Sequence, residues 1–276
     1  MITILQAVLL GVLQGITELF PISSLGHSVI FPALFGWEEL QKDPLFLNFL
    51  VGTHLATALV LIVMFWSDWR EIAKGFFRSL KQRRISSQDA NAKLAWLLII
   101  GTIPAGILGL LFEEPLEALF STPDYAVMFL ALNGVMLLIA ERLPKKSGTH
   151  IEQTTWAQSV GVGASQALAL FPGFSRTGST IVGGLLVGLS HKDALRYSFL
   201  LATPIIAAAS LLKLPELFTD HGKAFLLPTL VGAVAAGSAA YFAVKFLTDY
   251  FQTKTLKPFG IYCIIAGLGA WLIIHI

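Results

Sequence analysis

Charged residues are scarce in this sequence. They make up 13% of its 276 residues, while 55% of the residues are hydrophobic. Soluble domains average roughly 25% charged residues. Several apolar runs also reach the length of about 20 residues that crosses a bilayer as a helix. The composition therefore excludes an ordinary soluble domain and predicts an integral membrane protein built from α-helices.

Cysteine is nearly absent too. The single Cys263 excludes both a disulfide framework and a cysteine metal site. The first apolar run has no basic segment before it and carries Gln14 and Glu18 inside it, so we expect no cleavable signal. The net charge of +2 comes with no tract typical of nucleic-acid binding, and we expect no nucleic-acid partner.

Six apolar runs predict six transmembrane helices. They cover residues 46–66, 94–112, 125–140, 197–212, 224–246 and 258–275. Basic loops of membrane proteins face the cytoplasm. This rule places loops 67–93, 141–155 (with Lys145 and Lys146), 191–196 and 247–257 inside, and loops 37–45, 113–124 and 213–223 outside.

Two further apolar stretches, 1–36 and 156–190, are each interrupted by a proline and glycines. We interpret each as a re-entrant helix–turn–helix pair whose tip lies inside the membrane, where irregular backbone needs protein or water around it. For every loop to lie on its assigned side of the membrane, the first pair must enter and leave from outside and the second from inside. Both termini are then outside.

Weak internal similarity links the two stretches. Phe20-Pro21 aligns with Phe171-Pro172, and Gln14 aligns with Gln166, at a near-constant offset. With the opposite orientations, this favours an inverted-topology duplication whose site lies where the halves meet. The predicted fold class is thus an all-α integral membrane protein with six transmembrane helices, two re-entrant helix–turn–helix pairs and an inverted-topology internal repeat. It forms one membrane domain, 1–276, with halves of about 1–140 and 151–276.

Residues 171–180, FPGFSRTGST, place one arginine, two glycines and several hydroxyls between apolar runs. Backbone N–H groups at a helix start and a guanidinium together form a cradle for an anion, most naturally phosphate. The candidate contacts in this second tip are Gly173, Ser175, Arg176, Thr177, Gly178, Ser179 and Thr180. The alternative is a loop with a snorkelling arginine.

The first tip would supply Gln14, Glu18, Ser23, Ser24 and His27 to the same cavity. Glu18 then binds a divalent cation or acts as a base, His27 transfers a proton and Ser24 is a candidate nucleophile. Purely structural roles for these residues also remain open. Glu18 would only neutralise Arg176, Ser23 and Ser24 would only cap a helix, and His27 would only bridge helices. For His54, a bond to a neighbouring helix is favoured over catalysis.

Three motifs resemble one family. Residues 14–18 (QGITE) fit an (E/Q)xxxE pattern, residues 21–27 (PISSLGH) resemble a P-I/V-S-S-S/T-G-H segment, and residues 172–180 (PGFSRTGST) fit PGxSR(S/T)GxT. Together they resemble the bacitracin-resistance type of undecaprenyl-pyrophosphate phosphatase. Gln14 stands where many members carry a carboxylate, and Leu25 where a hydroxyl is usual.

This resemblance implies hydrolysis of a polyprenyl diphosphate to the monophosphate and inorganic phosphate, which recycles the lipid carrier of cell-wall polymers and confers bacitracin resistance. It further implies dependence on a divalent cation, typically magnesium or calcium. By the same resemblance the site contains Glu18, Ser24, His27, Ser175, Arg176 and Thr180, with Gln14 as a weaker member. Of these, Glu18, Ser24, His27 and Arg176 are expected to be catalytic, in an active site open to the outer face of the bacterial inner membrane. A covalent phosphoserine and direct attack by water both stay open, as does a homodimer. The alternative from another class is a transporter or flippase of the lipid phosphate.

Overall fold

The structure is a computed structural model that describes residues 2–43, 45–120, 122–143, 150–220 and 222–276. Every regular element in these ranges is an α-helix or a short 3-10 helix. Six helices are long and apolar enough to cross a membrane: α4 (Leu45–Met64), α6 (Ala90–Leu111), α8 (Pro123–Glu141), α11 (His191–Lys213, continued by 3-10 helix η3, Leu214–Phe218), α12 (Lys223–Tyr250) and α13 (Lys257–His275). The prediction of six spanning helices is confirmed.

Helix α11 begins earlier than predicted. Its start lies at His191, six positions before the predicted residue 197, because the Ser190 side chain accepts a hydrogen bond of 3.1 Å from the Asp193 N–H and caps the helix. The apolar run therefore covers only part of the helix, and the polar first turn extends beyond it.

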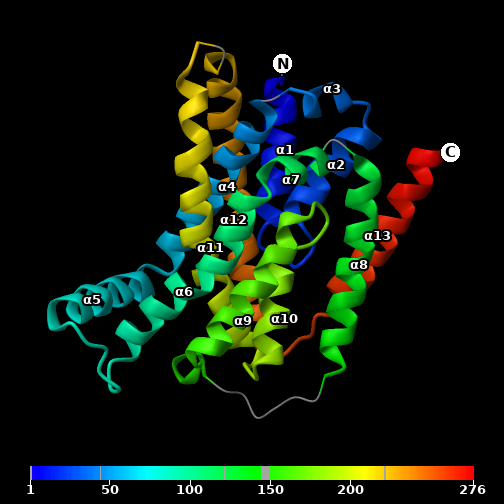
Figure 1. Ribbon diagram of the computed structural model, residues 1–276. Helices are drawn as coiled ribbons and strands as arrows, with labels where there is room; N and C mark the ends of the chain where they lie inside the picture. The colour runs from blue at the N-terminus through cyan, green and yellow to red at the C-terminus, as the bar shows by residue number, and fades with distance from the viewer. Residues whose placement is uncertain (1, 44, 121, 144–149, 221) are drawn as a thin grey trace.

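The stretch 67–93, predicted as a loop, contains helix α5 (Trp66–Gln82). Its polar and apolar residues alternate with the period of a helix, so hydropathy alone does not reveal it. Gly75 lies against the backbone of Ala92, and the Trp96 indole N–H donates to Ser79 Oγ at 2.9 Å, which fixes α5 on α6. Figure 1 shows α5 projecting sideways from the long helices, at the left of the view.

The two interrupted stretches form two short helix pairs. The first is α1 (Ile4–Thr17) with α2 (Ser24–Leu34), and the second is α9 (Trp156–Gln166) with α10 (Arg176–Leu186), joined through the 3-10 helix η2 (Ala167–Leu170). Figure 1 shows the first pair descending from the upper end of the molecule and the second rising from the lower end. Their connecting tips therefore lie in the interior, between the long helices.

Small residues hold the first pair in place. A Cβ at Gly11 would lie 2.3 Å from the Gly232 carbonyl oxygen, and one at Gly15 would lie 2.2 Å from that of Ala236. Close approach of this kind is how helices pack in membranes. Helix α1 is thus seated directly on the backbone of α12, which fixes the height of the tip that follows it.

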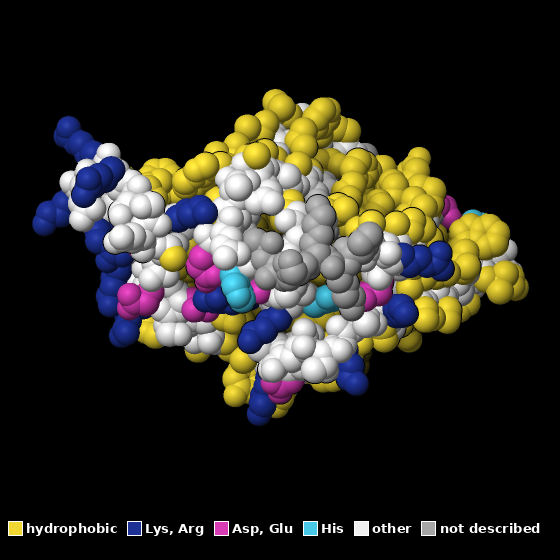
Figure 2. All heavy atoms as spheres, turned by 90° about the horizontal axis from the view of Figure 1, so that it is seen from below, with side chains coloured by type: hydrophobic (Ala, Val, Ile, Leu, Met, Phe, Trp, Pro, Cys, Tyr) yellow, Lys and Arg dark blue, Asp and Glu magenta, His cyan; other side chains and the backbone are white. Residues whose placement is uncertain are grey.

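The lower end of the molecule carries many cationic side chains. Figure 2 views that end and shows Lys and Arg side chains gathered there. Residues 144–149, which include Lys145 and Lys146 of the predicted cytoplasmic loop, lie outside the described residues. The remaining elements are the short helices α3 (Glu38–Gln41) and α7 (Glu113–Phe120) and the 3-10 helix η1 (Ile151–Gln153).

Candidate active site

The tips of the two helix pairs touch each other, as predicted. A Cβ at Gly26, in the first turn of α2, would lie 2.7 Å from Gly173 Cα in the opposite tip. Gly173 itself has a φ of 113°, a conformation that favours glycine. A Cβ there would also meet the Ala126 carbonyl oxygen of α8 at 2.5 Å. The glycines in the two tips thus allow backbone to pack directly on backbone.

Asn133 of α8 joins the two tips. Its amide Nδ2 donates to the Pro21 carbonyl at 3.0 Å, and its Oδ1 accepts from the Ser175 backbone N–H at 3.1 Å. Two further bonds cross between the tips directly: Thr177 Oγ1 donates to the Glu18 carbonyl at 2.9 Å, and Ser175 Oγ donates to the Phe20 carbonyl at 3.3 Å. The two halves of the chain are therefore held in one register at this point.

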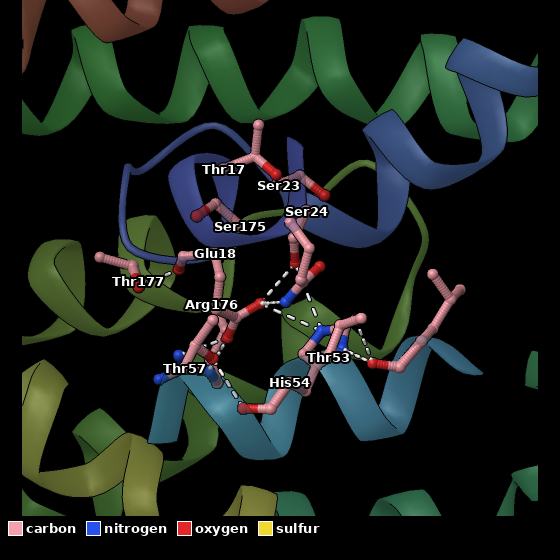
Figure 3. A network of polar contacts seen from close by, with 12 residues as sticks. Thr17, Glu18, Ser23, Ser24, Thr53, His54, Thr57, Ser175, Arg176 and Thr177 are labelled. Carbon is pink, nitrogen blue, oxygen red and sulfur yellow. Dashed lines mark hydrogen bonds and ion pairs between the residues drawn. The ribbon is translucent and has the colours of Figure 1, made fainter. Parts of the chain in front are cut away.

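The Glu18 carboxylate is the centre of the polar network (Figure 3). Its Oε1 accepts from Arg176 Nη2 at 2.6 Å and from Nε at 3.2 Å. Its Oε2 accepts from Ser24 Oγ at 2.5 Å and from Gln14 Nε2 at 3.1 Å. The acid of the first tip and the arginine of the second thus form a buried ion pair, with Ser24 on the other oxygen.

His54 of α4 completes the network, and its contacts are with the neighbouring helix pair, as the sequence favoured. Its Nε2 lies 3.1 Å from Glu18 Oε2 and 3.4 Å from Ser24 Oγ. Its Nδ1 lies 2.7 Å from the Leu50 carbonyl oxygen. Both ring nitrogens therefore face oxygen acceptors, an arrangement that suits the doubly protonated, cationic ring. The only sequence feature that pointed to His54 as a site residue was its position inside an apolar span.

His27 lies apart from this network. Its Nδ1 is 2.6 Å from the Ser23 carbonyl oxygen, and its Nε2 is 2.8 Å from Tyr262 Oη of α13. The two rings are stacked, with centroids 5.8 Å apart. The structure therefore brings Gln14, Ser24 and Arg176 into contact with Glu18. His27 instead bridges α2 and α13, which is the structural role considered for it from the sequence.

The other predicted hydroxyls mainly serve the backbone. Ser23 caps α2, where its Oγ accepts from the Gly26 N–H at 3.1 Å, and Ser175 caps α10, where its Oγ accepts from the Gly178 N–H at 3.0 Å. Thr180 Oγ1 donates to the Arg176 carbonyl at 2.8 Å. The Ser179 hydroxyl is buried with no hydrogen-bond partner among the described residues. These caps fix the start of each tip helix.

A cavity of about 360 Å³ reaches the network. Glu18, Ser24, His54 and Arg176 lie in its lining, together with Gln166 and Ser175. The rest of the lining is largely apolar and comes mainly from α6 and α11. Leu116 of α7 and Lys213 at the end of α11 also line it, so the cavity extends toward the upper end in Figure 1. A polar group joined to an apolar one suits such a lining.

Comparison with known proteins assigns the family. The model of a family described as bacitracin resistance protein BacA matches residues 7–269. The chain belongs to the BacA family. An undecaprenyl-diphosphatase of Mycolicibacterium paratuberculosis is 46% identical over 97% of this chain and 96% of that protein. An undecaprenyl-diphosphatase 2 of Chromobacterium violaceum is 43% identical over 96% of each chain. The resemblance read from the three motifs is confirmed.

The motifs imply a divalent cation, and Glu18 is the side chain expected to hold it. Among the residues described here, no group of three or more His, Cys, Asp or Glu side chains is arranged to hold a metal ion. Glu18, the predicted ligand, already accepts hydrogen bonds on both oxygens, and the charge of Arg176 lies against it. Glu18 alone does not fit a resident cation, and the dependence on magnesium or calcium stays a prediction.

Proposed function

We propose that the protein is an undecaprenyl-diphosphatase that hydrolyses the lipid diphosphate to undecaprenyl phosphate and inorganic phosphate. One observation carries this proposal. A buried carboxylate that holds an arginine, a serine and a histidine lies at the end of a largely apolar cavity, in a member of the BacA family. The relatives reported above are named for this activity. The family assignment favours hydrolysis over the transporter alternative.

Electrostatics supports phosphate binding at the network. Arg176 uses Nε and Nη2 on Glu18, while its Nη1 is buried without a partner among the described residues. We propose that Nη1 donates to a phosphoryl oxygen. Arg176 and, when its ring is protonated, His54 place two positive side chains beside one carboxylate, so the site attracts an anion. Charge that develops on the transferred phosphoryl group is stabilised by such fixed donors.

Ser24 lies where a nucleophile is needed, beside the Glu18 base. In the covalent form of the proposal, Ser24 Oγ bonds to the terminal phosphorus, the bond to the bridging oxygen breaks, and undecaprenyl phosphate leaves. Glu18 takes the serine proton, and water then releases inorganic phosphate. In the direct form, Glu18 and Ser24 orient a water that attacks the same phosphorus. Acid quench with substrate labelled on the terminal phosphate separates the two: label retained on wild type and absent from Ser24→Ala supports the covalent form.

The shape of the cavity supports a lipid substrate taken from the outer leaflet. Its apolar walls suit the isoprenyl chain, and its extension toward α7 and the end of α11 reaches the end of the molecule that the basic-loop rule places outside. We further propose that the α1–α2 and α9–α10 pairs are re-entrant and belong to two inverted repeats within a single membrane domain. Their opposite directions in Figure 1 support this arrangement.

The proposal is tested by phosphate release from undecaprenyl diphosphate in detergent. Wild type is compared with Glu18→Gln and Arg176→Ala, each with magnesium, calcium or a chelator present. We expect release by the wild type and a loss of about a hundredfold or more in kcat/KM for both variants, because each removes transition-state charge stabilisation. A folded wild type that releases no phosphate would overturn the proposed activity and lead to an assay of lipid movement in vesicles.

A further inference from the structure

Gln166, at the end of α9, is buried in the lining of the cavity. Its exposed fraction is 2%. Neither Nε2 nor Oε1 has a partner among the described residues, although the residue lines the same cavity as Glu18 and Arg176. A buried amide left unpaired costs free energy. Such a group at a binding cavity indicates a ligand that completes it.

Gln14 shows what the same side chain does when it has a partner. Its Nε2 donates to Glu18, four residues later in the chain, at 3.1 Å. The residue four positions after Gln166 is Leu170, which has no acceptor in its side chain. The two glutamines thus precede the two tips in the same way. A carboxylate stands four residues after Gln14, whereas a leucine stands four residues after Gln166. The amide of Gln166 is left for a group from outside the chain.

The neighbouring side chains indicate the chemical class of that group. Arg176 Nη1 is the other buried donor of the cavity lining with no partner in the described part of the chain. Two unpaired donors in one cavity favour an anion with several acceptor oxygens, which can accept from both. We infer that Gln166 binds the diphosphate of the substrate, with its Nε2 donating to a phosphate oxygen. This inference rests on the proposed function.

The test compares Gln166→Leu, which keeps the volume but removes the amide, with Thr229→Val as the matched control. The Thr229 hydroxyl is also buried without a partner among the described residues, but it does not line the cavity. Both variants remove an unpaired polar group, so neither should lower the unfolding temperature in detergent. We expect Gln166→Leu to lose about tenfold or more in kcat/KM for undecaprenyl diphosphate, since hydrogen bonds to charged groups are the stronger ones. Thr229→Val should match the wild type.

Gln166→Asn adds a graded readout and replaces the leucine variant if that variant does not fold. Its shorter amide should raise KM and retain part of the activity. Activity of Gln166→Leu within about twofold of the wild type would overturn the inference and leave the proposed function intact, because it would show that water alone satisfies the amide. A wild type that releases no phosphate would overturn both together.

Discussion

A single methyl group at Gly26 should disable the site by forcing the two tips apart. In Gly26→Ala the new Cβ would lie 2.7 Å from Gly173 Cα and 2.9 Å from its nitrogen. Carbon atoms in contact are normally about 3.5–4.0 Å apart. Both neighbours are backbone atoms, so the clash can be relieved only by moving one tip by about 1 Å against the other. A misplacement of that size in an active site can cost about a hundredfold in rate.

The same substitution elsewhere serves as the control. Gly161 lies in α9, and a Cβ there meets no atom within 4 Å. Alanine is the better helix former by about 1 kcal/mol, so Gly161→Ala should be as stable as the wild type or more stable. Phosphate release and thermal unfolding in detergent are measured for both variants. We expect about a hundredfold loss of kcat/KM in Gly26→Ala and no loss in Gly161→Ala. A fully active Gly26→Ala would refute the claim that contact between the tips sets the geometry of the site.

Three further predictions follow from the contacts of individual residues. Asn133→Leu strands the Pro21 carbonyl and the Ser175 N–H, so it should lower the free energy of unfolding by about 2 kcal/mol or more; unchanged denaturation in detergent would contradict this. His54→Phe should lower kcat/KM about tenfold, and His54→Gln, which keeps an N–H donor, should lower it less; equal losses would argue against a role for that donor. On intact cells, a thiol reagent that cannot cross the membrane should label Asp220→Cys and not Arg84→Cys; the reverse pattern would invert the proposed orientation.

Much of the fold was predictable because apolar runs and their breaks carry direct physical meaning. The six spans follow from length and hydropathy, and the two tips follow from Pro21 and Pro172 within apolar sequence. The contact between the tips was expected from the opposite directions of the two pairs. Helix α5 was missed because its apolar residues are spread over one face, so its average composition is that of a polar loop.

The site was predictable where a motif fixes neighbouring residues and not where the fold brings distant ones together. Glu18, Ser24 and Arg176 were expected to meet, and they do. His54 reaches the same carboxylate from a separate helix, and no spacing in the sequence predicts that contact. His27 follows Ser24 closely in the chain, yet its ring pairs with Tyr262, which is 235 residues away. Such pairings depend on which helices pack together.

The most direct test of the account is a double-mutant cycle on kcat/KM between Glu18→Gln in the first tip and Arg176→Lys in the second. In the proposed site these two residues act as one unit across the contact between the tips. Residues that act as a unit have strongly non-additive effects. The double variant should therefore be little worse than the poorer single variant. Losses that multiply would show that the two side chains act independently, which would contradict a shared site.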